Sequence, residues 1–366
     1  MEFSRRVEIT RVVLPGIAFL GILVAIFLPM FKKASASSNQ APGEATSSPW
    51  RALSSPVEVE LRGLAVISAK VAWASGAKGV ILRTVDGETW QQIAVPGAEA
   101  LDFRDIEAWD EKTAVALSIG PGETSGVHKT TDGGVTWKKT FANKEPTGFW
   151  DAIAFRDRHS GSLFGDPVRG RFQVFTTSDG GESWVATPDA GMPEALENEG
   201  GFAASGSCLV SGSGQRLSFV TGGAAEARVF VSVDDGRTFR VSKSPVPAGA
   251  PSKGLFSALF VDNSTLLTVG GDYRERTLAG VNVGRSPDAG LTWTATQASP
   301  IGFLSSVVRG PGPDAAIVAV GLAGTGISND GGQTWTALDA TPYNAAGFAA
   351  GSGFAVGPKG VIARWR

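Results

Sequence analysis

An eight-residue pattern recurs along this chain and constrains its fold more than any other feature. Its fullest copy, TTDGGVTW, occupies residues 130–137, and five further copies keep the aspartate, a glycine and the closing aromatic residue. The six aspartates are Asp86, Asp132, Asp179, Asp234, Asp288 and Asp330, and successive ones lie 46, 47, 55, 54 and 42 residues apart. This period is typical of one four-stranded β-propeller blade per copy.

Each position of the pattern has a mechanical role in a tight turn. The carboxylate can accept hydrogen bonds from backbone N–H groups, glycine adopts positive φ, and the aromatic ring fills the gap between neighbouring sheets. Each copy supplies one carboxylate, apart from Asp234-Asp235, and no glutamate stands at a coordinating offset. We therefore expect the six aspartates to be structural, with no bound metal.

The amino-acid composition limits the kinds of functional site that this chain can form. The chain has 48 Gly and 10 Trp but only 2 Tyr, 2 His and 1 Cys, which excludes an intrachain disulfide and a His/Cys zinc cage. A net charge of −2 gives no overall basic field for nucleic acid. Cys208 stands in an apolar stretch and is predicted to be a core residue. We expect no cofactor and no nucleic-acid partner.

The repeat resembles the Asp-box, or bacterial neuraminidase, repeat of S/T-x-D-G-G-x-T-W form, which lies between the third and fourth strands of a blade. A seventh unit, residues 346–366, follows the last copy and lacks a fourth strand, which the segment after Trp50 can supply. We predict an all-β fold over residues 50–366. It is a seven-bladed β-propeller of four-stranded antiparallel blades, closed by an N-terminal strand that completes the last blade and leaves no open edge.

The N-terminus has a different character. Residues 12–31 carry no charge and are long enough to cross a bilayer as a helix. We predict a membrane anchor or signal segment at residues 1–33 and a flexible linker at 34–49. An uncleaved anchor is favoured because the apolar stretch exceeds the usual signal core, although Ala34-Ser35-Ala36 offers a cleavage pattern. The propeller would then lie on the periplasmic or extracytoplasmic side of the cytoplasmic membrane, or be secreted after cleavage.

The face opposite the repeats is the candidate binding face, because propeller sites usually open at one end of the central channel. Two of its loops, LFGDPVRGRF and GGDYRERTLAG, stand out by length and charge. The alternative is that their charged pairs only tie neighbouring blades together. The predicted ligand- or partner-binding residues are Arg62, Arg104, Trp150, Asp166, Arg169, Arg171, Glu199, Asp272, Tyr273 and Arg274.

A second resemblance covers roughly residues 50–366. Segments such as FGDPVRGRFQVFTTSDGGESW and VGGDYRERT resemble the photosystem II stability/assembly factor family and its non-photosynthetic bacterial relatives. For the photosynthetic branch the resemblance implies a non-enzymatic assembly factor; for the bacterial relatives, which the two quoted loops resemble, it supplies no biochemical role. Our leading hypothesis is a binding or assembly module. We expect a monomer whose partner is a protein at the membrane or a glycan.

An enzymatic alternative stays open. Sialidases carry Asp boxes on six-bladed propellers and use a Tyr/Glu nucleophile pair with an Asp acid/base. In this chain a glycan-active hydrolase or lyase would use Glu199, Tyr273, Asp166 and Asp272 as catalytic residues. The blade count disfavours this alternative. The two histidines, His128 and His159, are predicted to lie away from the binding face, which disfavours a Ser-His-Asp hydrolase.

Overall fold

The computed structural model describes residues 48–296, 300–311 and 316–366. The predicted anchor at residues 1–33 and nearly all of the predicted linker lie outside the described residues. Within the described ranges, no helix has the length and apolar character that a membrane crossing requires.

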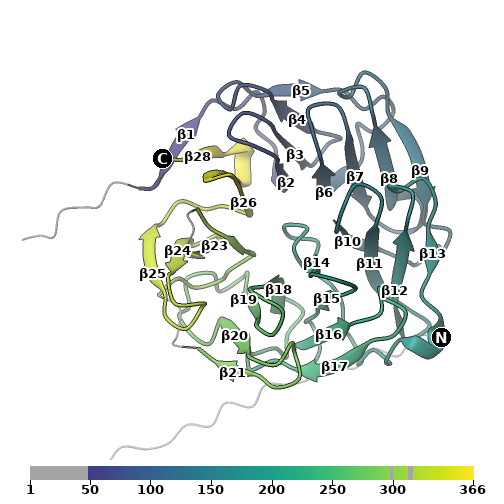
Figure 1. The fold of residues 1–366 in the computed structure, drawn as a ribbon, viewed down its shortest axis with the longest axis vertical. Helices are drawn as coiled ribbons and strands as arrows, with labels where there is room; N and C mark the ends of the chain where they lie inside the picture. Colours follow the sequence, from purple (N-terminus) through teal and green to yellow (C-terminus); the bar gives the residue numbers. More distant parts are fainter. Residues whose placement is uncertain (1–47, 297–299, 312–315) are drawn as a thin grey trace, which may run out of the picture. The chain divides into compact units, whose positions relative to one another are not determined.

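Seven antiparallel sheets of four strands each surround a common centre (Figure 1). The first contains β2 (Leu61–Val66), β3 (Ala72–Gly76), β4 (Ile81–Thr84) and β5 (Gln91–Ile93). The second contains β6 (Asp102–Ala108), β7 (Ala114–Ile119), β8 (Gly126–Thr130) and β9 (Lys138–Ala142). The third contains β10 (Trp150–Phe155), β11 (Gly161–Val168), β12 (Arg171–Thr177) and β13 (Val185–Ala186).

The remaining sheets repeat this order. The fourth contains β14 (Leu209–Ser211), β15 (Leu217–Val220), β16 (Arg228–Ser232) and β17 (Arg240–Lys243). The fifth contains β18 (Lys253–Phe260), β19 (Leu266–Asp272), β20 (Val283–Ser286) and β21 (Thr294–Ala295). The sixth contains β22 (Ser306–Arg309), β23 (Ile317–Gly321), β24 (Gly324–Ser328) and β25 (Thr336–Asp339). The described residues also include the short 3-10 helices η1 (Gly122–Thr124), η2 (Asp189–Gly191) and η3 (Pro358–Gly360).

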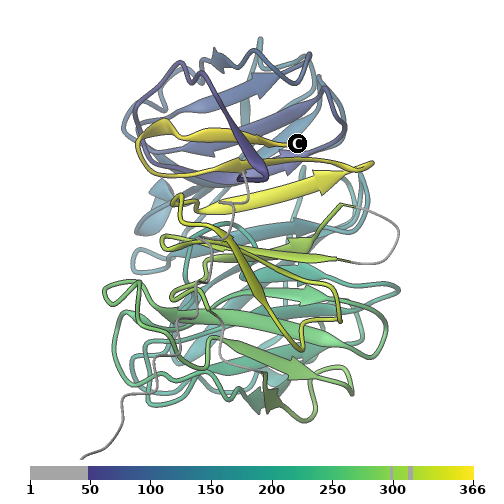
Figure 2. The same cartoon turned by 90° about the vertical axis from the view of Figure 1, so that its left-hand side faces the viewer.

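The seventh sheet joins the two ends of the described chain. Its order is β1 (Trp50–Leu53), β28 (Ile362–Trp365), β27 (Ser352–Val356) and β26 (Ala345–Ala349). Trp50 lies opposite Trp365 and Leu53 opposite Ile362 in the antiparallel register. Both views place the purple β1 beside the yellow C-terminal strands (Figures 1 and 2). The predicted seven-bladed fold and its closure by an N-terminal strand are therefore confirmed.

Trp50 holds the closing strand in place. Its side chain is only 4% exposed, and its Nε1 donates a 3.0 Å hydrogen bond to Oγ1 of Thr325 in the sixth sheet. The indole also packs on Tyr343 and meets Trp365 edge to face, with ring centroids 5.6 Å and 4.8 Å away. These contacts fix β1 to two sheets at once.

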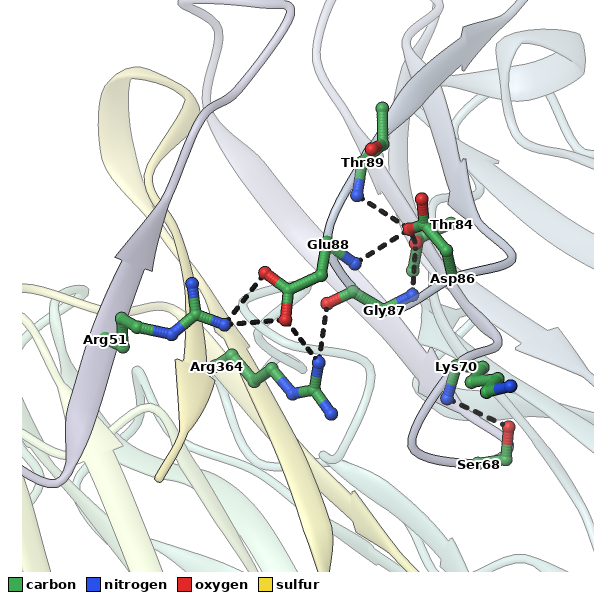
Figure 3. A network of polar contacts seen from close by, with 9 residues as sticks. All are labelled: Arg51, Ser68, Lys70, Thr84, Asp86, Gly87, Glu88, Thr89 and Arg364. Carbon is green, nitrogen blue, oxygen red and sulfur yellow. Dashed lines mark hydrogen bonds and ion pairs between the residues drawn. The ribbon is translucent and has the colours of Figure 1, made fainter.

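The six repeated turns share one hydrogen-bond pattern, shown for the first copy in Figure 3. Oδ1 of Asp86 accepts hydrogen bonds from the backbone N–H groups of Glu88 and Thr89, at 2.8 Å and 2.7 Å. The hydroxyl of Thr84 donates to the same carboxylate and accepts from the N–H of Gly87. Backbone donors around this carboxylate lower the pKa of Asp86 to about 2. The equivalent hydroxyl and N–H contacts recur at Asp132, Asp179, Asp234, Asp288 and Asp330.

The first of these turns also touches the closing sheet. The Glu88 carboxylate accepts hydrogen bonds from Arg51 of β1, at 2.7 Å and 2.8 Å, and from Arg364 of β28, at 2.6 Å (Figure 3). Arg51 and Glu88 are both about half exposed, so solvent screens their ion pair and it contributes little to stability. Burial of Trp50, rather than this ion pair, therefore dominates the closure.

We predict that Trp50→Ala lowers the free energy of unfolding by about 3–5 kcal/mol, because it removes a buried indole and leaves a cavity between two sheets. Arg51→Ala, one residue further along the same strand, should cost about 0–1 kcal/mol. Urea unfolding followed by tryptophan fluorescence and by circular dichroism measures both. Equal losses in the two variants would contradict this account of the closure.

Candidate functional site

Residues 200–207, here called the central segment, cross the centre of the ring between β13 and β14. Side chains from several sheets hold its backbone: Arg104 donates to the carbonyl of Ala203 at 3.0 Å, and Arg62 donates to that of Ala204 at 3.2 Å. The segment also donates outward. The N–H of Gly201 binds Oδ1 of Asp166 at 2.8 Å, and the hydroxyl of Ser205 binds the carbonyl of Ser305 at 2.8 Å. Charged side chains thus satisfy three of the backbone polar groups of this segment.

Two glycines allow the central segment to fit. A Cβ at Gly201 would lie 2.6 Å from the ring of Phe164 and 2.7 Å from Oδ2 of Asp151. Gly206 has a φ of 78°, and a Cβ there would lie 2.2 Å from Oδ1 of Asp105. A larger residue at either position would displace a side chain of an inner strand.

The central segment lies between two cavities. The first, called the channel cavity, has a volume of about 480 Å³ and is lined by residues 205–207 and by the first strand of every sheet, β2, β6, β10, β14, β18, β22 and β26. The second, called the end cavity, has a volume of about 390 Å³ and is lined by residues 201–204. The end cavity opens on the face opposite the repeated turns, because its other residues come from starts of first strands and from loops between second and third strands.

The end cavity brings together four of the ten predicted binding residues. Arg62 and Arg104 lie on one part of its wall, and Asp166 and Tyr273 complete the set. The wall also contains residues that the sequence prediction omitted, namely Asp151, Phe202, Phe256 and Phe303. Little in the sequence marks these residues as part of a site. Asp151 only follows the predicted residue Trp150, and Phe202 stands in a run of small residues.

Glu199 does not line the end cavity and is occupied as a structural tie. It is buried, its Oε1 accepts a 2.6 Å hydrogen bond from the hydroxyl of Thr221, and its Oε2 accepts from the N–H of Leu196 at 2.8 Å. Arg228 forms an ion pair with the same carboxylate. The grouping of Glu199 with Tyr273 that a sialidase-like mechanism requires is therefore not formed in this cavity.

The arginines of the third sheet's loop also pair locally. Arg169 lies 3.2 Å from Oε1 of Glu145, and Arg171 lies 3.2 Å from Oε1 of Glu194 while donating to the carbonyl of Met192. These contacts match the alternative in which the charged loop ties neighbouring parts of the propeller together. Neither arginine lines the end cavity.

The last three predicted residues are also outside the end cavity. Trp150 is fully buried and stacks on Phe141 with ring centroids 4.9 Å apart, so its indole belongs to the core. Oδ1 of Asp272 accepts the N–H of Arg274 at 2.9 Å, which stabilises an exposed turn next to Tyr273. Asp272 and Arg274 therefore lie outside the end cavity, although Tyr273 between them lines it.

The end cavity contains two arginines that form ion pairs and two carboxyl groups that form none within the described residues. Arg62 pairs with Glu60 at 3.0 Å and Arg104 with Asp102 at 2.7 Å. Burial, with a contribution from Arg104, lowers the pKa of Arg62 to about 10. Burial raises the pKa of Asp166 to about 6, and burial together with the charge of Asp166 raises that of Asp151.

The channel cavity contains a second acidic pair on β6. Asp105 is buried and accepts backbone N–H groups of Ile106 and Ile153, both at 2.8 Å. Burial nevertheless raises the pKa of Asp105 to about 7. Burial and the neighbouring Asp105 raise the pKa of Glu107 to about 8. Folding therefore increases the proton affinity of both carboxyl groups.

Comparison with known proteins supports the fold. No family model and no curated protein matches this chain. Among solved structures, YCF48 bound to a D1 peptide is 17% identical, with a TM-score of 0.62 over 87% of this chain and 96% of that one. YCF48 from Cyanidioschyzon merolae is 17% identical, with a TM-score of 0.60 over 87% and 98%. The WD40 β-propeller domain of Doa1 is 10% identical, with a TM-score of 0.56 over 87% and 97%.

These likenesses lie below 25% identity and show the fold alone. Together with the described geometry, they place the chain among the β-propellers, with a cavity at one end of its central channel.

We predict that Gly201→Ala lowers the free energy of unfolding by roughly 1–3 kcal/mol, because the added methyl collides with Phe164 and Asp151. Gly280→Ala is the matched control, since the nearest atom to its new methyl is 3.9 Å away. Thermal and urea unfolding compare the two variants. A loss of stability in Gly280→Ala as large as that in Gly201→Ala would contradict the close packing of the central segment.

A further prediction concerns pH. An acid whose pKa is raised on folding binds protons more tightly in the folded state, so stability falls as pH rises from its unfolded towards its folded pKa. With a folded pKa of about 8, Glu107 should contribute such a loss between about pH 5 and pH 8. Glu107→Gln should make the urea midpoint depend less on pH over this range, whereas the exposed Glu111→Gln should not. An unchanged slope in Glu107→Gln would refute the assignment.

Proposed function

We propose that this protein is a binding or assembly module that captures a protein partner at the end cavity. The main support is the convergence of most of the ring on that cavity. Residues in or next to six of the seven sheets line it, from Arg62 at the first to Asn344 at the seventh, and the central segment that leads into the fourth sheet completes the lining. Hydrogen bonds that Arg62 and Arg104 donate and that Asp166 accepts hold its floor, so the site is organised before a partner arrives.

The comparisons support a binding role without identifying the partner. One structure of the same fold contains YCF48 with a D1 peptide, so a propeller of this kind accommodates a peptide. The sequence resemblance to photosystem II assembly factors favours the same class of function. We extend the proposal to the six repeated turns, which we assign to the Asp-box repeat on their shared hydrogen bonds.

We also propose that the module works as a monomer on the outer side of the cytoplasmic membrane. Support comes from the uncharged stretch at residues 12–31, which would tether the propeller or direct its secretion. Expression of the chain with a C-terminal reporter that is active only outside the cytoplasm tests this location.

Site-specific photocrosslinking tests the binding site. A photoreactive amino acid at Tyr273, which is 39% exposed at the end cavity, should crosslink a membrane-associated protein in native membranes. The control position is Val135, which is 80% exposed in a repeated turn on the opposite face. Crosslinks that form equally at both positions, or only at Val135, would place the partner elsewhere.

A glycan assay addresses the enzymatic alternative. The purified protein should not turn over acidic or neutral glycans under the binding hypothesis. Turnover that Asp166→Asn abolishes would replace the binding function with a catalytic one, because Asp166 is the predicted catalytic carboxylate that the structure brings to the end cavity.

A further inference from the structure

The arginines of the end cavity already have their counter-charges. Arg62 lies 3.0 Å from Glu60, and both Nε and Nη2 of Arg104 contact Asp102 at 2.7 Å. Each guanidinium also donates to a carbonyl of the central segment. Because these cations are paired and partly used to hold the floor, little positive charge remains for a ligand.

The carboxyl groups have no such partners. Within the described residues, neither Asp151 nor Asp166 forms an ion pair, and Oδ2 of Asp151 is buried without a hydrogen bond. Asp151 is only 1% exposed, yet it belongs to the lining of the end cavity. A buried carboxyl group without a counter-charge is costly, so it favours the approach of a cation.

The two carboxyl groups meet at one point of the central segment. Gly201 donates its N–H to Oδ1 of Asp166, and a Cβ on the same residue would touch Oδ2 of Asp151 at 2.7 Å. Asp166 is the more accessible of the two, because it is half-buried where Asp151 is fully buried. A ligand would therefore meet Asp166 first, with Asp151 behind it.

Aromatic rings complete the same cavity. Phe202 of the central segment stacks on Phe256 with centroids 4.0 Å apart, and Phe303 meets Phe256 edge to face at 4.7 Å. The ring of Tyr273 lies 6.2 Å from that of Phe256 and is partly exposed. Ring faces attract ammonium and guanidinium groups and also cover the apolar stems that carry them.

From this arrangement we propose that the end cavity binds a lysine or arginine side chain of the partner protein, between the Asp151–Asp166 carboxyl pair and the rings of Phe202, Phe256, Tyr273 and Phe303. The inference rests on the proposed function and names the group that the partner inserts. A volume of 390 Å³ is near the lower end of ligand sites, which suits one long side chain. A cation would also offset the desolvation that raises the pKa of both carboxyl groups.

The probes are four acetylated and amidated pentapeptides with lysine, arginine, norleucine or glutamate at the centre of four glycines. The chain has two tyrosines, so selective ¹³C-tyrosine labelling places one NMR probe at Tyr273 in the cavity and the other at the buried Tyr343. The lysine or arginine peptide should shift the Tyr273 signal and leave that of Tyr343 unchanged. The norleucine and glutamate peptides should bind at least tenfold more weakly.

Asp166→Asn tests the role of the carboxyl group. The asparagine Oδ1 can still accept the N–H of Gly201, so the variant should keep the wild-type unfolding temperature while binding the cationic peptides at least tenfold more weakly. The control is Asp189→Asn, an exposed aspartate of η2 outside the end cavity, which should bind normally.

Three results would overturn the inference: equal binding of the norleucine peptide, preference for the glutamate peptide, or no shift of Tyr273 with any peptide. Preference for glutamate would instead assign the ligand to Arg62 and Arg104. These results are separable from failure of the proposed function, because a protein crosslinked at Tyr273 would remain a partner whichever side chain it inserts. Absence of that crosslink would reject the proposed function itself.

Discussion

The antiparallel pairing of β1 with β28 joins the two ends of the described chain and closes the ring of seven sheets. Only in a closed ring do the first strands of all the sheets surround one centre. Trp50 makes the closure by filling a space between the sixth and seventh sheets while its indole N–H reaches Thr325. Next to the innermost strand of the seventh sheet, Asn344 lines the end cavity and donates hydrogen bonds to Oε1 of Glu60 and to the carbonyl of Leu61 at the first sheet.

Closure creates a central space, and the polar character of the site follows from how that space is filled. The central segment brings backbone N–H and C=O groups into a buried region, where each needs a partner. Arg62 and Arg104 supply donors and Asp166 an acceptor, so charged residues that look like ligand-binding groups also hold the floor. Arg62 and Arg104 form ion pairs with Glu60 and Asp102, whereas Asp151 and Asp166 form no ion pair within the described residues. Because of this difference, we expect the end cavity to prefer a cationic side chain.

The structure brings some of the predicted residues together at the end cavity and leaves others elsewhere, according to what each side chain contacts. Arg62, Arg104, Asp166 and Tyr273 lie at the end cavity, as their loops and strand starts suggested. Glu199 instead pairs with Arg228, and Trp150 stacks on Phe141. Phe256 and Phe303 look like ordinary strand hydrophobics in the sequence, and only the packing against Phe202 makes them part of a wall.

The architecture could be predicted from the repeat, because each turn contains its own hydrogen-bond partners within eight residues and the spacing of the six copies matches one blade each. The missing strand of the last unit likewise indicated where the N-terminal strand had to pair. Which charges remain unpaired became visible only in the folded chain, because some ion pairs, such as Glu199 with Arg228, join residues 29 positions apart. Desolvation and such longer-range pairing depend on distances in the folded chain, and a linear pattern does not encode those distances.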